Sequence, residues 1–355
     1  MSGTSLDGID CVLVRLHPDR AELVAARCTA FEPALRANLA ALMQPGSDEM
    51  HRAAIAANAL ADAYADATAR LLADTGLSPG DVAAIGAHGQ TVRHRPDLGY
   101  TVQLLNGARL AERTGVRVVC DFRSRDVAAG GQGAPLVPAF HAFAFGSGSD
   151  GRCVVNLGGI ANVTRLAATG PVQGFDTGPA NGLLDAWCAD HRGTSFDADG
   201  SWASSGTVDA VLLGRFLADP YFAALPPKST GREHFNAGWT ARHLRGTERP
   251  EDVQATLTEL TAASLADAIR RWCPDTREVF LCGGGVHNRH LVARIAANLP
   301  GVRVDTSAAL GIDPDWVEAI AFAWLAHRCL AGEPGNLPAV TGAKGLRVLG
   351  AVYPA

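Results

Sequence analysis

Short apolar runs alternate with longer amphipathic segments along most of this 355-residue chain. The runs 82–86, 116–120 and 279–282 have the length and residue types of buried strands, whereas 51–73 and 259–272 carry apolar residues at helical spacing. This alternation predicts an α/β architecture in which helices cover a sheet. We expect further helices over 204–217, 289–299 and 316–331. The length exceeds what one hydrophobic core usually organises, so we expect two domains.

Composition narrows the class of protein. Apolar residues make up 47% of the chain and charged residues 19%, as in ordinary globular proteins, and the formal net charge is −5. We therefore expect no nucleic-acid or membrane partner. The eight cysteines are scattered without a C-x-x-C pair, which favours reduced thiols over disulfides or a zinc site. No segment has the pattern of a signal peptide or a membrane span, so we expect a cytoplasmic protein.

The first ten residues form a glycine- and hydroxyl-rich turn that leads directly into the apolar run 11–16. Backbone N–H groups and hydroxyls in such a turn can surround a phosphate, and Asp7 and Asp10 could hold a cation against it. The same sequence is also typical of a plain hairpin turn. In either case the partner strand of the hairpin would precede Met1. We expect the native protein to begin upstream with an apolar strand.

Two further glycine turns follow apolar runs. Residues 158–162 separate the strand-like segments 154–157 and 163–166, a layout similar to that of the N-terminus. Residues 283–288 follow a strand and open a helix, which is a suitable seat for an anion or a nucleotide. A dinucleotide site of an NAD(P) oxidoreductase is a weaker reading, because Asn288 stands where its fingerprint requires glycine. The three turns together favour nucleotide binding.

Several charged residues stand where catalytic or binding groups are often found. Asp176 lies in a Gly-Phe-Asp-Thr-Gly-Pro stretch that reads as a turn before a helix. It is suited to be a general base, or alternatively an Asx-type cap of its own turn. Asp121 and Arg123 follow a strand end, where ligands often bind, although a structural ion pair also fits. Glu318 stands at the start of a helix, where an acidic residue also suits the helix dipole.

The order of these motifs resembles that of the actin, sugar kinase and Hsp70 ATPase superfamily, with its phosphate 1, phosphate 2 and adenosine elements at 3–10, 156–162 and 280–285. Within that superfamily the chain closely resembles the anhydro-N-acetylmuramic acid kinase family, and the likeness runs nearly from end to end. The stretches that carry it are 86–91, 121–123, 128–138, 174–181, 227–233 and 337–343.

The resemblance implies a two-domain actin-like ATPase fold, in the α/β class, with a central interdomain cleft. We expect an N-terminal domain over 1–135, with 332–355 as a candidate addition, and a C-terminal domain over 136–331. It also implies a homodimeric kinase of cell-wall recycling. Such a kinase opens the 1,6-anhydro ring of anhydro-N-acetylmuramic acid with water. It phosphorylates O6 with ATP and releases N-acetylmuramic acid 6-phosphate and ADP.

The same motifs imply which residues of this chain correspond to the functional residues of the family. Asp176 matches the catalytic base, and Asp7 is the candidate for holding Mg²⁺ through water. Sugar contacts are expected from Gln90, Asp121, Arg123 and Glu318. The residues expected to bind ATP are Gly3, Thr4, Ser5, Leu6, Asp7, Gly8, Ile9, Asp10, Gly158, Gly159, Asn162, Gly283, Gly284 and Gly285.

The chain departs from the family pattern in two places. The family carries a strand before the first glycine turn, which puts the sheet edge and the affinity for ATP in doubt here. The run 104–107 lacks the acidic residue that the family tends to have, which puts a local loop in doubt. A non-enzymatic ATP switch of the same superfold is the alternative function. The Thr-Gly-Pro turn around Asp176 and the absence of a substrate-binding appendage speak against it.

Overall fold

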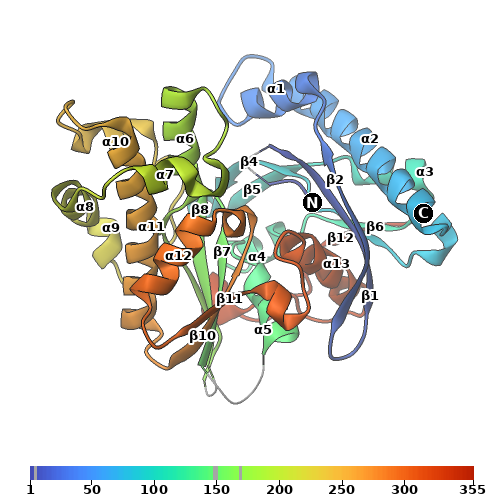
Figure 1. Ribbon diagram of the computed structural model, residues 1–355. Helices are drawn as coiled ribbons and strands as arrows, with labels where there is room; N and C mark the ends of the chain where they lie inside the picture. The colour runs from blue at the N-terminus through green and yellow to red at the C-terminus, as the bar shows by residue number, and fades with distance from the viewer. Residues whose placement is uncertain (4–5, 147–150, 168–169) are drawn as a thin grey trace. The chain divides into compact units, whose positions relative to one another are not determined.

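The computed structural model describes residues 1–3, 6–146, 151–167 and 170–355. The chain forms two compact units, Met1–Ala144 with Glu318–Ala355, and Phe145–Val317. Figure 1 shows helices and strands in both, so the expected α/β class is confirmed. The two units are divided after residues 144 and 317. The expected domain boundaries at 135 and 331 stay a prediction.

Aromatic packing explains why helix α13 (Val317–Leu330) belongs with the first unit from Glu318 onward. Its Trp324 ring stacks 5.6 Å from the ring of Phe143 on helix α5 (Val137–Phe145). Its Phe322 ring lies 5.5 Å from that of Phe122. Sequence patterns show that this helix is apolar, but they do not show which sheet it covers.

The second unit is built on a five-stranded sheet in the order β11-β10-β7-β8-β9. Strands β11, β10 and β7 are parallel to one another. Strand β8 runs antiparallel to β7, and β9 runs antiparallel to β8. Buried apolar side chains of one sheet face join helices α11 and α12 in a single core. The strands are β7 (Gly151–Leu157), β8 (Ile160–Leu166), β9 (Gln173–Pro179), β10 (Thr276–Cys282) and β11 (Arg303–Thr306).

Helix bounds in this unit differ from expectation in two main places. The helix expected over 259–272 already begins at Pro250. The helix expected over 204–217 is interrupted at Gly206, whose backbone is extended. Only glycine fits there, because a Cβ atom would lie 2.1 Å from the Glu251 carbonyl oxygen. Asp209 then caps a new helix by accepting from two backbone N–H groups. The helices are α6 (Asn181–Arg192), α7 (Ser201–Ser205), α8 (Ala210–Leu217), α9 (Pro220–Ala223), α10 (Ala237–His243), α11 (Pro250–Trp272) and α12 (Arg289–Asn298).

The first unit contains three small sheets, β1-β2, β12-β6-β3 and β4-β5. Helix α2 packs on β1 and β2, and its buried face carries Leu60, Tyr64 and Leu71. The strands are β1 (Gly8–Leu16), β2 (Ala21–Ala30), β3 (Ile85–Gly86), β4 (Gln90–Arg95), β5 (Tyr100–Leu104), β6 (Val118–Cys120) and β12 (Ala351–Tyr353). The other helices are α1 (Pro33–Leu42), α2 (Glu49–Thr75), α3 (Gly107–Thr114), α4 (Ser124–Ala128) and α14 (Pro338–Thr341).

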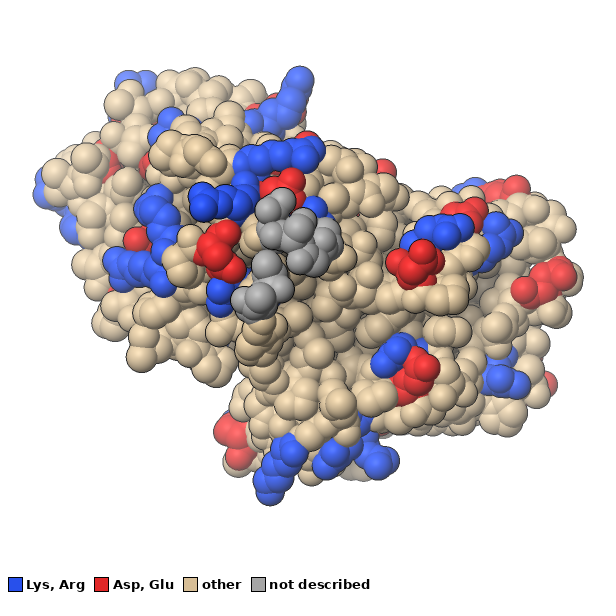
Figure 2. All heavy atoms as spheres, turned by 90° about the horizontal axis from the view of Figure 1, so that it is seen from below, with Lys and Arg blue, Asp and Glu red and all other residues tan. Residues whose placement is uncertain are grey.

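Surface charge is mixed. On the face in Figure 2, basic and acidic side chains are interspersed. Exposed ion pairs such as Arg303 with Asp305 occur on the surface of the chain. Within the described ranges, no helix has both the length and the apolarity needed to cross a membrane. None of the eight cysteines is joined in a disulfide in the described part of the chain.

Candidate active site

A row of polar side chains crosses the sheet of the second unit. Asn156, Asn162 and Asp176 lie opposite one another on the adjacent strands β7, β8 and β9. Their strand neighbours Val155 and Val163 point into the apolar core. Because side chains alternate along a strand, the polar row lies on the other face of the sheet. Asn162 and Asp176 were expected in turns, but both belong to strands, which corrects that detail.

Asp176 is held from three sides. The Thr230 backbone N–H donates to its Oδ2 at 3.0 Å, and the Tyr221 hydroxyl donates to its carbonyl oxygen at 2.8 Å. Its own N–H donates to the Lys228 carbonyl oxygen at 3.0 Å. In the part of the chain that the structure describes, the second carboxylate oxygen receives no hydrogen bond. One oxygen is therefore anchored, and the other is available to a water molecule or a substrate.

Burial raises the pKa of Asp176 to about 6. The negative charge of Glu233 also raises this pKa. The hydrogen bond from the Thr230 N–H and the positive charge of Lys228 lower it, but by less than burial raises it. A carboxylate with a pKa close to neutral pH is a better proton acceptor than an ordinary exposed aspartate. Asp176 thus has the environment of a general base.

Tyr221 and Thr230 were missed by the sequence reading. They lie 45 and 54 residues after Asp176, and no local pattern relates them to it. Tyr221 also accepts a hydrogen bond from Lys228 Nζ at its carbonyl oxygen, at 3.0 Å. Asp219 fixes the start of the same short helix by accepting from the Tyr221 N–H at 2.9 Å.

The second glycine turn lies between β7 and β8. The Gly158 carbonyl oxygen accepts the Asn181 N–H at 3.0 Å, and the Gly159 carbonyl oxygen accepts the Ala180 N–H at 3.1 Å. The turn is thereby fastened to the start of helix α6. A Cβ atom at Gly159 would lie 3.7 Å from the guanidinium of Arg232, so a positive charge accompanies this turn. That combination suits a phosphate.

The third glycine turn follows β10, which is parallel to β7. The turns at 158 and 283 therefore leave the same edge of the sheet. Gly283 has a φ of 80°, and a Cβ atom there would lie 2.1 Å from Asn156 Oδ1. A Cβ atom at Gly285 would lie 2.5 Å from that of Leu157, whereas one at Gly284 would meet nothing within 4 Å. Two glycines thus allow close packing, and the middle one faces open space.

The first glycine turn belongs to the other unit. The Leu6 N–H donates to the Gly3 carbonyl oxygen at 3.2 Å, and Gly8, Ile9 and Asp10 begin β1. Asp7 is exposed. Thr4 and Ser5, both expected to bind ATP, lie outside the described residues.

Gln90 forms hydrogen bonds to residues at the start of this turn. It is fully buried, its Nε2 donates to the Gly3 carbonyl oxygen at 3.2 Å, and its Oε1 accepts from Ser2 Oγ at 3.0 Å. Its amide therefore positions the glycine turn. The expected sugar contact of Gln90 stays a prediction.

Arg123 is the centre of a second cluster in the first unit. Its Nη2 lies 2.9 Å from His88 Nε2, and its Nη1 donates to the Gly133 carbonyl oxygen at 2.8 Å. Burial lowers the pKa of Arg123 to about 10, and the charge of Glu318 opposes this. Burial also raises the pKa of Glu318, and Arg123 opposes that shift. The arginine and the glutamate therefore stabilise each other's charge.

Asp121 lies at the end of β6, in the left-handed conformation, and accepts a hydrogen bond from Ser124 Oγ at 2.5 Å. It is exposed, unlike Arg123. Asp121, Arg123 and Glu318 remain predicted sugar contacts.

The residues present fit a Mg²⁺ ion that is held jointly by a protein carboxylate and the phosphates of a bound nucleotide. In the described ranges, no three His, Cys, Asp or Glu side chains form a cluster that could hold a metal ion by themselves. Mg²⁺ is commonly held by one or two carboxylates together with substrate phosphates. The exposed Asp7 carboxylate, next to the first glycine turn, meets that requirement.

Two glycine turns at the carboxyl ends of parallel strands, in the same unit as a half-buried carboxylate with a raised pKa, are features that an ATP-dependent kinase needs. The family model described as anhydro-N-acetylmuramic acid kinase matches residues 1–355, and the chain belongs to this family.

Named relatives agree with this family. The chain is 54% identical over 357 residues to an anhydro-N-acetylmuramic acid kinase of Nitrosomonas europaea, covering 100% of this chain and 98% of the relative. It is 55% identical over 363 residues to that of Xanthomonas campestris pv. campestris, covering 100% and 96%. A solved activator of 2-hydroxyisocaproyl-CoA dehydratase from Clostridium difficile, with bound ADPNP, is similar at 13% identity and a TM-score of 0.42, over 84% of each chain.

Proposed function

We propose that this enzyme opens the 1,6-anhydro ring of anhydro-N-acetylmuramic acid with water and phosphorylates O6 with ATP. The products are N-acetylmuramic acid 6-phosphate and ADP. The observation that carries the proposal is the half-buried Asp176 carboxylate, with a pKa of about 6, in a polar row next to two glycine turns. Membership of the family supports the choice of substrate.

Asp176 acts on the water. Its free carboxylate oxygen takes a proton as the water oxygen bonds to the anomeric carbon, and the bond from that carbon to O6 breaks. O6 then takes the γ-phosphoryl group, and the bond from the γ-phosphorus to the bridging oxygen of ADP breaks. The Thr230 N–H holds the other carboxylate oxygen, so the base keeps one orientation throughout.

In the second unit, the turns at 158–159 and 283–285 bind the nucleotide. Arg232 lies beside the first of them and offsets phosphate charge. In the first unit, the turn at 3–10 binds phosphate through its backbone. When bound, Mg²⁺ would neutralise charge that develops on the phosphoryl group, and Asp7 would hold it through water.

Activity should fall in acid, because the base must be ionised to accept a proton. We expect kcat to be constant above pH 7 and to fall about tenfold per pH unit below pH 6. The measurement is kcat between pH 4.5 and 8.5, with circular dichroism at each pH to confirm that the protein stays folded. If kcat did not fall with decreasing pH near pH 6, Asp176 would not be the general base.

Release of ADP separates the kinase from the alternative ATP switch. With ATP and Mg²⁺ present, addition of anhydro-N-acetylmuramic acid should raise ADP release by at least tenfold. A switch protein would release ADP at the same rate with and without the sugar.

We also propose that the enzyme is a cytoplasmic homodimer. The family resemblance supports this part. Light scattering of the purified protein should give twice the mass of the 36.9 kDa chain, and a monomer would contradict it.

A further inference from the structure

Two stretches that carry the family resemblance, 128–138 and 337–343, have no role in the reaction proposed above. They meet in the first unit at Asp126 of helix α4, which is 0% exposed. A carboxylate that is removed from water in this way is costly unless hydrogen-bond donors surround it. The donors around Asp126 therefore indicate what this carboxylate does.

Three donors from two segments meet the Asp126 carboxylate. Its Oδ2 accepts from the Gly133 N–H at 2.8 Å. Its Oδ1 accepts from Asn336 Nδ2 at 2.7 Å and from Thr341 Oγ1 at 2.8 Å. An asparagine at position 126 would turn its own N–H groups toward the Gly133 N–H or toward Asn336 Nδ2, so this set of donors requires a carboxylate. These four residues form the Asp126 network.

The glycine-rich loop folds tightly over this carboxylate. A Cβ atom at Gly131 would lie 2.2 Å from Asp126 Oδ2, so only glycine allows the loop to come this close. The Gln132 N–H donates to the Thr341 carbonyl oxygen at 2.7 Å, which fastens the loop to helix α14 as well. The position of Gly133 is therefore fixed from both sides.

The carbonyl group of Gly133 leads from Asp126 to Arg123. It accepts a hydrogen bond from Arg123 Nη1 at 2.8 Å. On another side of the guanidinium, His88 Nε2 lies 2.9 Å from Arg123 Nη2. His88 Nδ1 lies 2.7 Å from the Gly89 carbonyl oxygen, which can only accept, so Nδ1 carries the ring proton and Nε2 accepts from Arg123. Two neutral acceptors thus set the direction of the guanidinium.

Asp126 also acts on Arg123 through its charge. Burial lowers the pKa of Arg123, and the charges of Glu318 and Asp126 oppose this shift. The Asp126 carboxylate thus favours the charged form of the guanidinium, while its hydrogen bond to Gly133 fixes an acceptor of that guanidinium.

We propose that Asp126 is a positioning residue for Arg123, and that it sets the affinity for the sugar through the Gly133 peptide group. This inference rests on the proposed function, in which Arg123 contacts the sugar. The Asp126 carboxylate is fully buried, so it acts through Gly133 and Arg123 rather than by contact with a substrate.

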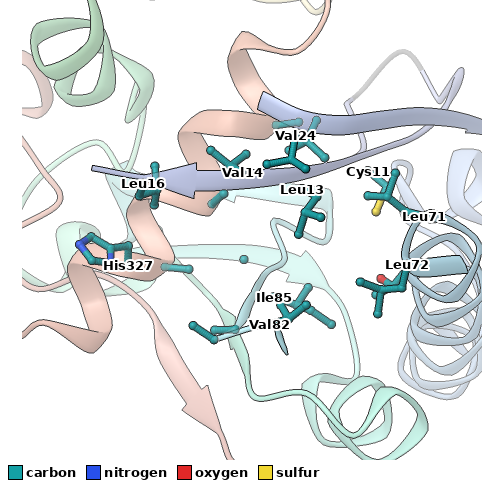
Figure 3. Close-up of a pocket in the computed structure, with 18 of the residues that line it drawn as sticks. Cys11, Leu13, Val14, Leu16, Val24, Leu71, Leu72, Val82, Ile85 and His327 are labelled. Atoms are coloured by element: carbon teal, nitrogen blue, oxygen red, sulfur yellow. The ribbon is translucent and has the colours of Figure 1, made fainter. Parts of the chain in front are cut away.

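The Asp126 network is separate from an open groove in the same unit. This apolar groove of about 420 Å³ has Leu13 and Val14 of β1 on one side and Val82 and Ile85 on the other (Figure 3). Among the described residues that line the groove, none belongs to the Asp126 network. A change at Asp126 therefore does not act on the sugar by reshaping the groove.

The test is a double-mutant cycle with Asp126→Asn, Arg123→Ala and the two together. We expect Asp126→Asn to raise KM for the sugar about tenfold, because a misdirected binding group loses most of its contribution. KM for ATP should stay within about a factor of two. In the double variant, KM for the sugar should exceed that of Arg123→Ala by no more than about a factor of two. Independent effects would multiply instead.

Thr341→Val is the matched control. It removes one donor from Asp126 Oδ1 and leaves the Gly133 hydrogen bond to Oδ2. Both variants should lower the unfolding midpoint, but Thr341→Val should leave KM for the sugar within about a factor of two. KM does not depend on the amount of folded enzyme, so lost stability alone does not reproduce the effect of Asp126→Asn.

Three results would overturn the inference: an unchanged KM in Asp126→Asn, effects that multiply in the double variant, or an equal rise in Thr341→Val. If Asp126→Asn does not fold, hydrogen exchange of the Gly133 amide in the wild type decides instead. Saturating sugar should slow this exchange about tenfold or more, and an unchanged rate would contradict the inference. Failure of the proposed function is distinct, because the wild type itself would then release no ADP in response to the sugar.

Discussion

Replacing Asp176 with Asn is expected to lower kcat by a factor of about 10² to 10⁴, the usual contribution of a general base. The amide has nearly the shape of the carboxylate and can keep the hydrogen bond from Thr230, but it cannot take a proton from water. Binding of ATP should be unchanged, because the glycine turns are untouched. The measurement is kcat with saturating substrates, together with calorimetric binding of a nonhydrolysable ATP analogue.

Asp74→Asn is the matched control for this substitution. Asp74 is exposed and pairs with Arg27, and an exposed pair of this kind contributes little to stability. Its kcat should stay within a factor of two of the wild type. If Asp176→Asn kept more than about a tenth of the wild-type rate, another group would have to be the base.

The second large effect is expected at the third glycine turn. Gly284→Val should raise KM for ATP at least tenfold while the unfolding midpoint stays within about 1 °C. A Cβ atom at this glycine meets nothing within 4 Å, so the new side chain has room in the protein. That room is where we place the adenosine end of ATP.

Two other glycines of the second unit provide controls. Gly214 on α8 is equally free of neighbours, and Gly214→Ala should change neither KM nor the midpoint. Gly285→Val should lower the midpoint, because its Cβ atom would lie 2.5 Å from that of Leu157. A normal KM in Gly284→Val would mean that the nucleotide does not approach this turn.

The sequence was sufficient for the α/β class, because the apolar runs 116–120 and 279–282 have the length of buried strands and the long helices carry apolar residues at helical spacing. It placed Asp176 in a turn, since Gly, Thr and Pro around it are typical turn residues. Pairing with β8 makes this stretch a strand instead. A cross-strand partner is a property of the folded sheet, and local composition does not report it.

The surroundings of Asp176 and Arg123 were harder to predict for a similar reason. Thr230 and Tyr221 reach Asp176 from a distant segment, and His88 reaches Arg123 across 35 residues. The raised pKa of Asp176 follows from burial, which depends on how those segments pack. The sequence therefore predicted the candidate base, but not the residues that orient its carboxylate and set its pKa.

Product analysis in water enriched in ¹⁸O tests the proposed reaction most directly. With ATP, Mg²⁺ and anhydro-N-acetylmuramic acid, the expected product has gained one water and one phosphoryl group, with one heavy oxygen at the anomeric carbon. One ADP should be released for each sugar converted. A phosphorylated sugar that still contains the anhydro ring, or ADP formed without any change in the sugar, would contradict a kinase in which Asp176 directs water to the ring.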